Sequence, residues 1–281
     1  MSKKEFTKGK ANQVSLGDRM KKYEAVTTEV KLIERLPIYA RIDMRAGHTW
    51  CKGLEKPFDS DYSNAMKTAT AYIVEKAGAA FGYCQSDEAS FCWSDDTKVP
   101  FGTRLFKLQS VLASMFTGAF IRACVGTKLE KRLDKCIPSF DCRVMNLPSL
   151  SEAANMLIWR EKDSIKNSIT LLALEHFSNK EIHKKNSDEK IEMLKKKGID
   201  YFSAIPEDLR YGAYFKREVY NKVLSAEDLK SIPERNWPKP NERGERTVVR
   251  SHVIQFMNGK PLMEIANKVA ALFPSECSQN T

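Results

Sequence analysis

Two stretches, PIYARIDMR at residues 37–45 and GYCQSDEASFCW at residues 82–93, decide how this chain is organised. In the first, Ile38, Ala40 and Ile42 alternate with tyrosine, arginine and aspartate. Successive side chains of a strand point to opposite faces, so an alternation with a period of two predicts a half-buried strand.

The second stretch predicts a hairpin with an acidic tip. Strand-like runs at residues 79–83 and 89–93 flank the polar residues 85–88, and a polar segment between two such runs favours a turn. If this hairpin lies beside the first strand, the carboxylates of Asp43 and Asp87 meet.

Two close carboxylates repel each other, and both stay ionised only when cations or strong donors lie between them. A pair of Mg²⁺ ions can fill that place, activating an attacking oxygen and stabilising the leaving one. Solvated turn carboxylates are the alternative, and the spacing of Asp43 and Asp87 alone leaves it open.

The order of predicted elements indicates an α+β domain with helices packed on a sheet. Residues 1–14 form a basic, flexible N-terminus, residues 15–225 the main domain and residues 226–281 a C-terminal extension. Periodicity and caps predict helices at residues 15–36, 60–76, 103–124, 149–177, 187–197 and 262–273, and further strands at residues 140–145, 211–220 and 247–257.

Composition narrows the partners. Lys and Arg number 46 against 36 acidic residues, a net charge of +10, which favours a nucleic acid or an anionic surface. No apolar run approaches the ~20 residues that cross a bilayer, so we expect no membrane partner. The seven cysteines include no C-x-x-C. They predict reduced thiols rather than a disulfide framework or a zinc site, which suits the cytoplasm and leaves an organelle open.

Four short words occur in order along the chain: RIDMR at 41–45, GH at 47–48, KPFD at 56–59 and QSDE at 85–88. Together they resemble the signature of the tRNA-His guanylyltransferase family, and the likeness runs from about residue 15 to 220. That family includes 3′-to-5′ polymerases that repair tRNA 5′ ends. The resemblance implies a palm-like antiparallel sheet flanked by helices, assembled as a homotetramer, with a helical part that contacts tRNA or other subunits.

The resemblance also implies the site. Asp43 and Asp87 would be the catalytic residues and, with the main-chain carbonyl of Met44, would hold two Mg²⁺ ions. The family usually has Gly at position 44, and a side chain is tolerated there only if φ is negative. ATP and GTP or other NTPs would be the substrates, and the implied nucleotide-binding residues are Asp43, Met44, Arg45, Ala46, Gly47, His48, Lys56, Ser86, Asp87, Arg104, Lys107 and Arg143.

The sequence departs from the family pattern at Ile165-Lys166-Asn167-Ser168. Enzymes that add the extra G to tRNA-His carry His-Ile-Asn-Asn there, whereas the repair-type relatives lack the His and the last Asn, as this chain does. Asp163 and Asn167 are retained, and a four-residue spacing puts them on one helix stripe with Trp159. They are predicted to face the activated 5′ end or the tRNA; a polar stripe without a ligand is the alternative.

These features predict a nucleotidyltransferase that adds nucleotides to the 5′ end of tRNA in the 3′-to-5′ direction. Two alternatives stay open. One is tRNA-His guanylyltransferase proper, which adds a single G. The other is a tRNA-binding protein whose metal site is vestigial.

Overall fold

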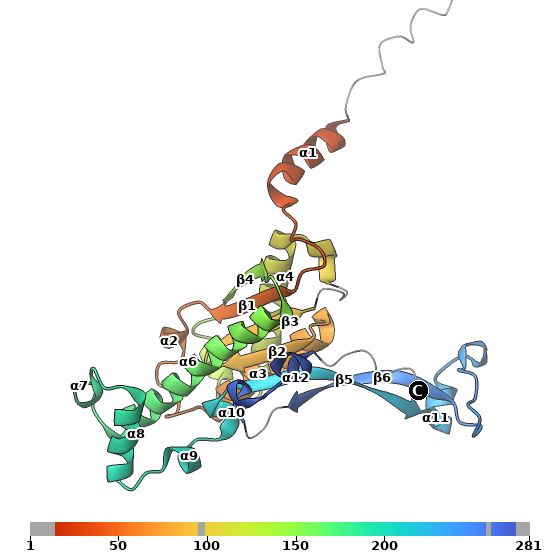
Figure 1. Ribbon diagram of the computed structural model, residues 1–281. Coiled ribbons are helices and arrows are strands. Elements are labelled where there is room, and N and C mark those ends of the chain that lie inside the picture. The colour runs from red at the N-terminus through yellow and green to blue at the C-terminus, as the bar shows by residue number, and fades with distance from the viewer. Residues whose placement is uncertain (1–14, 95–98, 257–259, 274–281) are drawn as a thin grey trace, which may run out of the picture.

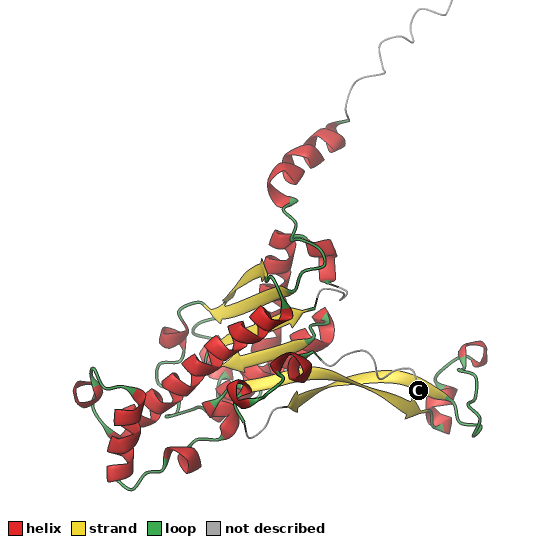
Figure 2. Cartoon of the chain, viewed as in Figure 1, coloured by secondary structure: helices red, strands yellow, loops and turns green. Residues whose placement is uncertain are grey.

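The computed structural model describes residues 15–94, 99–256 and 260–273, which form one sheet with helices on both faces (Figures 1 and 2). The predicted basic segment 1–14 lies outside the described residues, as does Cys277. The other six cysteines are free thiols. None of the helices in the described ranges has the length and apolar character needed to span a membrane.

The sheet is antiparallel throughout, and its six strands follow the order β4-β1-β3-β2-β5-β6. This confirms the predicted α+β class with a palm-like antiparallel sheet, and it confirms the acidic hairpin. The strands are β1 (Ile38–Met44), β2 (Phe81–Gln85), β3 (Glu88–Trp93), β4 (Phe140–Asn146), β5 (Ala213–Val223) and β6 (Thr247–Phe256).

The alternation predicted for β1 is present, but both faces of the strand are covered. Ile38, Ala40 and Ile42 pack into a core with the helices on one face. Tyr39 enters a second core on the other face. Only Arg41 and Asp43 of β1 keep partial exposure, so the strand is more buried than its sequence predicted.

Helices α3 (Ser60–Ala77) and α4 (Leu105–Cys124) cover the first face. Asp59 caps α3 by accepting a hydrogen bond from the Tyr62 N–H, and Gly78 ends it in the left-handed conformation. Leu108 and Leu112 of α4 are fully buried. Both helices were predicted, and the short η1 (Pro100–Thr103) and α5 (Glu130–Leu133) flank α4.

The long helix α6 (Leu150–His176) crosses the second face (Figure 1). Its far half packs with the short helices of a helical lobe, built around Leu172, Leu194 and Tyr201. The lobe contains α7 (Asn179–Ile182), α8 (Ser187–Lys196), α9 (Tyr201–Ala204) and α10 (Glu207–Arg210).

Strands β5 and β6 run beyond the rest of the sheet as a two-stranded ribbon (Figure 1). The ribbon carries α11 (Ala226–Lys230) and η2 (Glu234–Asn236) at its tip. Residues 226–281, predicted as an extension, therefore supply β6 to the same sheet. The single helix predicted at 262–273 was wrong: η3 (Leu262–Glu264) and α12 (Lys268–Leu272) are separate.

Helix α1 (Leu16–Thr28) begins at the predicted serine cap, Ser15, but ends well before residue 36. It projects away from the sheet (Figure 1). Its apolar side chains, including Tyr23 and Val26, are exposed. The helical spacing was correct, but the described part of the chain leaves most of the apolar side of this helix uncovered.

Candidate active site

The two predicted aspartates lie at the same end of the sheet. Asp43, near the end of β1, is opposite Glu88 of β3 and opposite Asp141 of β4. Asp87 occupies the two-residue turn between β2 and β3, and its carbonyl accepts a hydrogen bond of 3.0 Å from the Met44 N–H. The turn is thus joined to the strand end that carries Asp43.

The backbone next to Asp87 leaves no room for a side chain at residue 47. Ser86, the first residue of the turn, has a φ of +49°. Gly47 begins the one-turn helix α2 (Gly47–Trp50) next to this turn. A Cβ on Gly47 would lie 2.0 Å from Oδ2 of Asp87, well inside van der Waals contact. The position of the carboxylate therefore depends on a glycine at residue 47.

The electrostatics of the pair indicate uncompensated charge. Burial raises the pKa of the Asp87 carboxyl, and repulsion from Asp43 is the next largest cause. Hydrogen bonding from Ser86 opposes the shift only in part. Neither aspartate forms an ion pair with any residue in the described ranges. A divalent cation would relieve this repulsion.

The oxygen ligands at this site suit Mg²⁺ better than they suit a metal whose ligands all come from the protein. Within the described ranges, no group of three or more His, Cys, Asp or Glu side chains is placed to hold a metal. Mg²⁺ commonly uses one or two carboxylates and completes its shell with water and substrate phosphates. Met44 lies in β1 and does not have a positive φ, so its side chain causes no backbone strain there.

A polar chain links the carboxylate end of the sheet to α6. The Arg160 guanidinium donates to both oxygens of Glu88, over 3.2 and 3.1 Å, and lies 3.6 Å from a carboxylate oxygen of Asp163. The Asn167 amide donates to Asp163 over 3.4 Å. Through Arg160, the predicted residues Asp163 and Asn167 are linked to Glu88, which neighbours Asp87 in sequence and Asp43 across the sheet.

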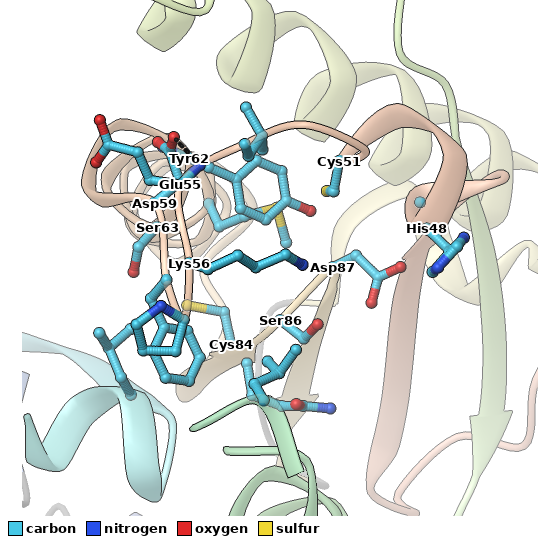
Figure 3. A pocket seen from close by; sticks show the side chains of 18 of the residues that line it. His48, Cys51, Glu55, Lys56, Asp59, Tyr62, Ser63, Cys84, Ser86 and Asp87 are labelled. Carbon is cyan, nitrogen blue, oxygen red and sulfur yellow. Dashed lines mark hydrogen bonds between the residues drawn. The ribbon is translucent and has the colours of Figure 1, made fainter. Parts of the chain in front are cut away.

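A cavity of about 380 Å³ opens beside Asp87 (Figure 3). In Figure 3 the Lys56 side chain extends across it toward Asp87, and His48 lies on the other side of that carboxylate. The volume lies in the range of small-ligand sites. Of the predicted nucleotide-binding residues, the cavity collects Gly47, His48, Lys56, Ser86 and Asp87.

Other predicted residues lie around the cavity rather than in it. Arg45 and Ala46 follow the strand end and are exposed. Arg143 of β4 is opposite Arg41, one two-residue repeat from the Asp43–Asp141 position and on the same face. Its Nε lies 3.6 Å from Asp141, and half of its side chain is exposed.

Arg104 and Lys107 lie elsewhere in this chain. The backbone of Arg104 forms an isolated antiparallel β-bridge with that of Lys31, and the carbonyl of the preceding Thr103 accepts a hydrogen bond from the Leu32 N–H. These contacts place the start of α4 at the Ile38 end of β1, about 17 Å along the strand from Asp43 at ~3.4 Å per residue. One chain therefore does not bring this pair to the carboxylates.

The sequence prediction missed several residues that build the site. Arg160 stood beside the predicted stripe without a role, and its three-residue spacing to Asp163 was the available signal. Tyr62, Lys67 and Asp208 line the cavity, and Lys67 forms an ion pair with Asp208. These three come from α3 and α10, and no local pattern in the sequence joins those helices.

Paired carboxylates at the end of an antiparallel sheet, beside a cavity, suit an enzyme of phosphoryl transfer. Comparisons with known proteins agree. The family model described as "tRNAHis guanylyltransferase" (Thg1) matches residues 17–148. A bacterial Thg1-like protein solved with ATP is 36% identical with a TM-score of 0.64, and the match covers 73% of this chain and 87% of that one.

Two further relatives extend the similarity. A bacterial Thg1-like protein solved with GTP is 29% identical with a TM-score of 0.62, covering 86% of this chain and 91% of that chain. The probable tRNA(His) guanylyltransferase of Drosophila melanogaster is 32% identical over 135 residues, 47% of this chain and 46% of its own length. The chain belongs to the tRNA-His guanylyltransferase family, which is a family of nucleotidyltransferases.

Proposed function

We propose that this protein adds nucleotides to the 5′ end of tRNA in the 3′-to-5′ direction, in tRNA 5′-end repair or maturation. The observation that carries the proposal is the Asp43–Asp87 pair, which has no ion-pair partner among the described residues and of which Asp87 lines a cavity of about 380 Å³. Its family membership and the ATP and GTP complexes of its relatives support the choice of nucleotide substrates.

In this proposal Asp43, Asp87 and the Met44 carbonyl hold two Mg²⁺ ions. When bound, the ions neutralise phosphate charge and lower the pKa of an attacking hydroxyl. The nucleoside triphosphate occupies the cavity. Lys56 and His48 lie on either side of the Asp87 carboxylate there. Arg45 and Arg143 are exposed cations near the same strand ends and would bind phosphate oxygens.

The reaction proceeds by two phosphoryl transfers. The 5′-phosphate of the RNA attacks the α-phosphorus of ATP, forming an adenylylated 5′ end and releasing pyrophosphate. The 3′-hydroxyl of an incoming NTP then attacks the 5′ phosphorus, forming the new phosphodiester and releasing AMP. An RNA that arrives with a 5′-triphosphate enters at the second step and releases pyrophosphate instead.

The helix α6 favours repair-type activity over strict action on tRNA-His. Ser168 stands where tRNA-His enzymes carry the last Asn of their motif, and it is buried, with its hydroxyl 2.7 Å from that of Tyr201. Ser168 is thus committed to the helical lobe and is not available to an RNA. Asp163 and Asn167 keep partial exposure and are the residues left to meet the 5′ end.

Incubation with labelled, 5′-truncated tRNAs, Mg²⁺ and each NTP separately tests the proposal. Asp43→Ala and Asp87→Ala should each lower turnover by about 10³-fold, since they remove charge stabilisation in the transition state. Both should still bind tRNA, and Asp188→Ala, an exposed position on α8, should behave as wild type.

Absence of 5′ extension on every truncated tRNA would contradict the proposal. Addition of a single G to tRNA-His alone would identify a tRNA-His guanylyltransferase proper. A tRNA-binding protein with a vestigial metal site would keep its cellular effect in both aspartate variants.

A further inference from the structure

A second hollow, of about 660 Å³, lies across α2 from the cavity. The cavity uses Gly47 and His48 of that helix, whereas the hollow uses Thr49 and Trp50. The hollow is bounded on its other side by residues 128–139, which include α5. We call it the cationic groove because its lining includes the basic side chains of Arg45, Lys52, Lys128, Lys131, Arg132 and Lys135.

No Asp or Glu is among the described residues that line the cationic groove. Lys128 is already paired with Glu55 and Asp59, and Arg132 donates to the carbonyls of Trp50 and Lys52. The remaining cations, Arg45, Lys52, Lys131 and Lys135, are exposed and form no ion pair with a described residue. Four unpaired cations around one hollow create a positive potential that attracts polyanions.

The wall of the groove is held rigidly. Trp50 is 5% exposed, and its indole N–H donates to the Cys136 carbonyl over 3.0 Å. The Arg132 guanidinium lies 5.4 Å from the centroid of the same ring. At the other end, the Arg45 N–H donates to the Ser139 carbonyl over 2.9 Å. The free cations therefore stand on a fixed scaffold rather than on a loose loop.

We propose that the cationic groove binds the phosphodiester backbone of the RNA strand whose 5′ end reacts at Asp43 and Asp87. Arg45 connects the two places, because it follows Asp43 by two residues and also lines the groove. Exposed lysines on an open surface suit successive backbone phosphates, which position an RNA without recognising its sequence. The identity of the strand rests on the function proposed above.

The test measures the Kd of a tRNA transcript at several KCl concentrations, without NTPs. Lys131→Gln/Lys135→Gln should reduce the slope of log K against log salt by about 2, one for each lysine, and weaken binding by roughly tenfold or more near 0.1 M salt. The matched control is Lys230→Gln/Lys239→Gln, two exposed lysines beyond the opposite edge of the sheet. It should leave slope and Kd unchanged, and both doubles should melt as wild type does.

An unchanged slope in Lys131→Gln/Lys135→Gln, or an equal loss in the control, would overturn the proposal. So would weaker binding of inorganic tripolyphosphate with unaltered tRNA binding, because the groove would then serve a free polyphosphate. The measurement needs no turnover, so it is independent of the 5′-extension assay. A changed slope without 5′ extension would keep the groove and remove the proposed reaction, whereas extension with an unchanged slope would do the reverse.

Discussion

Asp87 carries a charge that the described side chains leave unbalanced. Its raised pKa means that the folded protein, without divalent cations, holds the carboxyl proton more tightly than the unfolded chain does. At low pH, the Asp87 carboxyl therefore raises the free energy of unfolding. That gain is lost as pH rises from the ordinary carboxyl value of 3.8 through the raised value.

Asp87→Asn removes this pH-dependent loss. Without divalent cations at pH 7, we expect the variant to melt above the wild type, with the difference shrinking toward pH 4. Mg²⁺ should raise the melting temperature of the wild type and have little effect on the variant. Calorimetry across pH checks this, with the exposed Asp188→Asn as the control. A variant that melts below wild type at pH 7 would show that the charge is already compensated.

Gly47 is the second residue on which the site depends. Gly47→Ala should move the Asp87 carboxylate, because the added Cβ would lie 2.0 Å from Oδ2. We expect a loss of nucleotidyl transfer comparable to that of Asp87→Ala. Gly118→Ala is the control, since nothing lies within 4 Å of its Cβ position in α4. It should raise the free energy of unfolding by up to about 1 kcal/mol and leave activity intact. Full activity in Gly47→Ala would mean that the turn can shift without harm.

At the scale of elements, the Glu88–Arg160 pair fastens α6 to the end of the sheet that carries Asp43 and Asp87. Both side chains are 9% exposed. Arg160→Met should lower the free energy of unfolding by about 3 kcal/mol because it leaves Glu88 buried without a partner, whereas Glu88→Leu/Arg160→Met should recover much of the loss. Urea unfolding measures both.

The ion pair between Lys222 and Asp228, more exposed at 42% and 29%, is the comparison. Lys222→Met should lower the free energy of unfolding far less than Arg160→Met does. Similar costs for Arg160→Met and Lys222→Met would show that the Glu88–Arg160 pair does not anchor the helix.

The elements also show where periodicity misleads. The apolar pattern at 262–273 predicted one helix, but the Glu161 carboxylate accepts the N–H groups of Leu262 and Met263, over 2.7 and 3.3 Å. Asn267 then caps a new helix by accepting the Ala270 N–H. A buried carboxylate from α6, 101 positions away in the chain for Leu262, thus fixes the backbone of η3, and no local pattern records that contact.

For the whole molecule, the separation of Arg104 and Lys107 from the carboxylates bears on the predicted homotetramer. If this pair binds a triphosphate at the active site, a second subunit has to supply it. The apolar face of α1 is exposed, and α1 lines a hollow together with Arg104 and Lys107. A partner subunit that covers α1 would therefore lie next to the pair.

Mixing two inactive variants tests this arrangement. Asp87→Asn and Arg104→Ala/Lys107→Ala should regain partial 5′-extension activity when co-refolded, because each supplies what the other lacks. A mixture of Asp87→Asn with Asp43→Asn should regain none, since both carboxylates must come from one chain. No recovery in the first mixture would remove Arg104 and Lys107 from a shared site.

The amino-acid sequence was enough to predict the strand with Asp43, the hairpin with Asp87, the capped helices and, through its ordered motifs, the family. The strand, the hairpin and the helices are local properties, because burial within an element repeats with the period of that element. The motifs are local too, since each is a short run of residues. The three-dimensional packing was needed to show that α6 joins Glu88 through Arg160, that α3 and α10 close the cavity, and that α4 begins at the far end of β1. Which elements meet depends on packing between segments distant in the chain, and side-chain periodicity does not encode it.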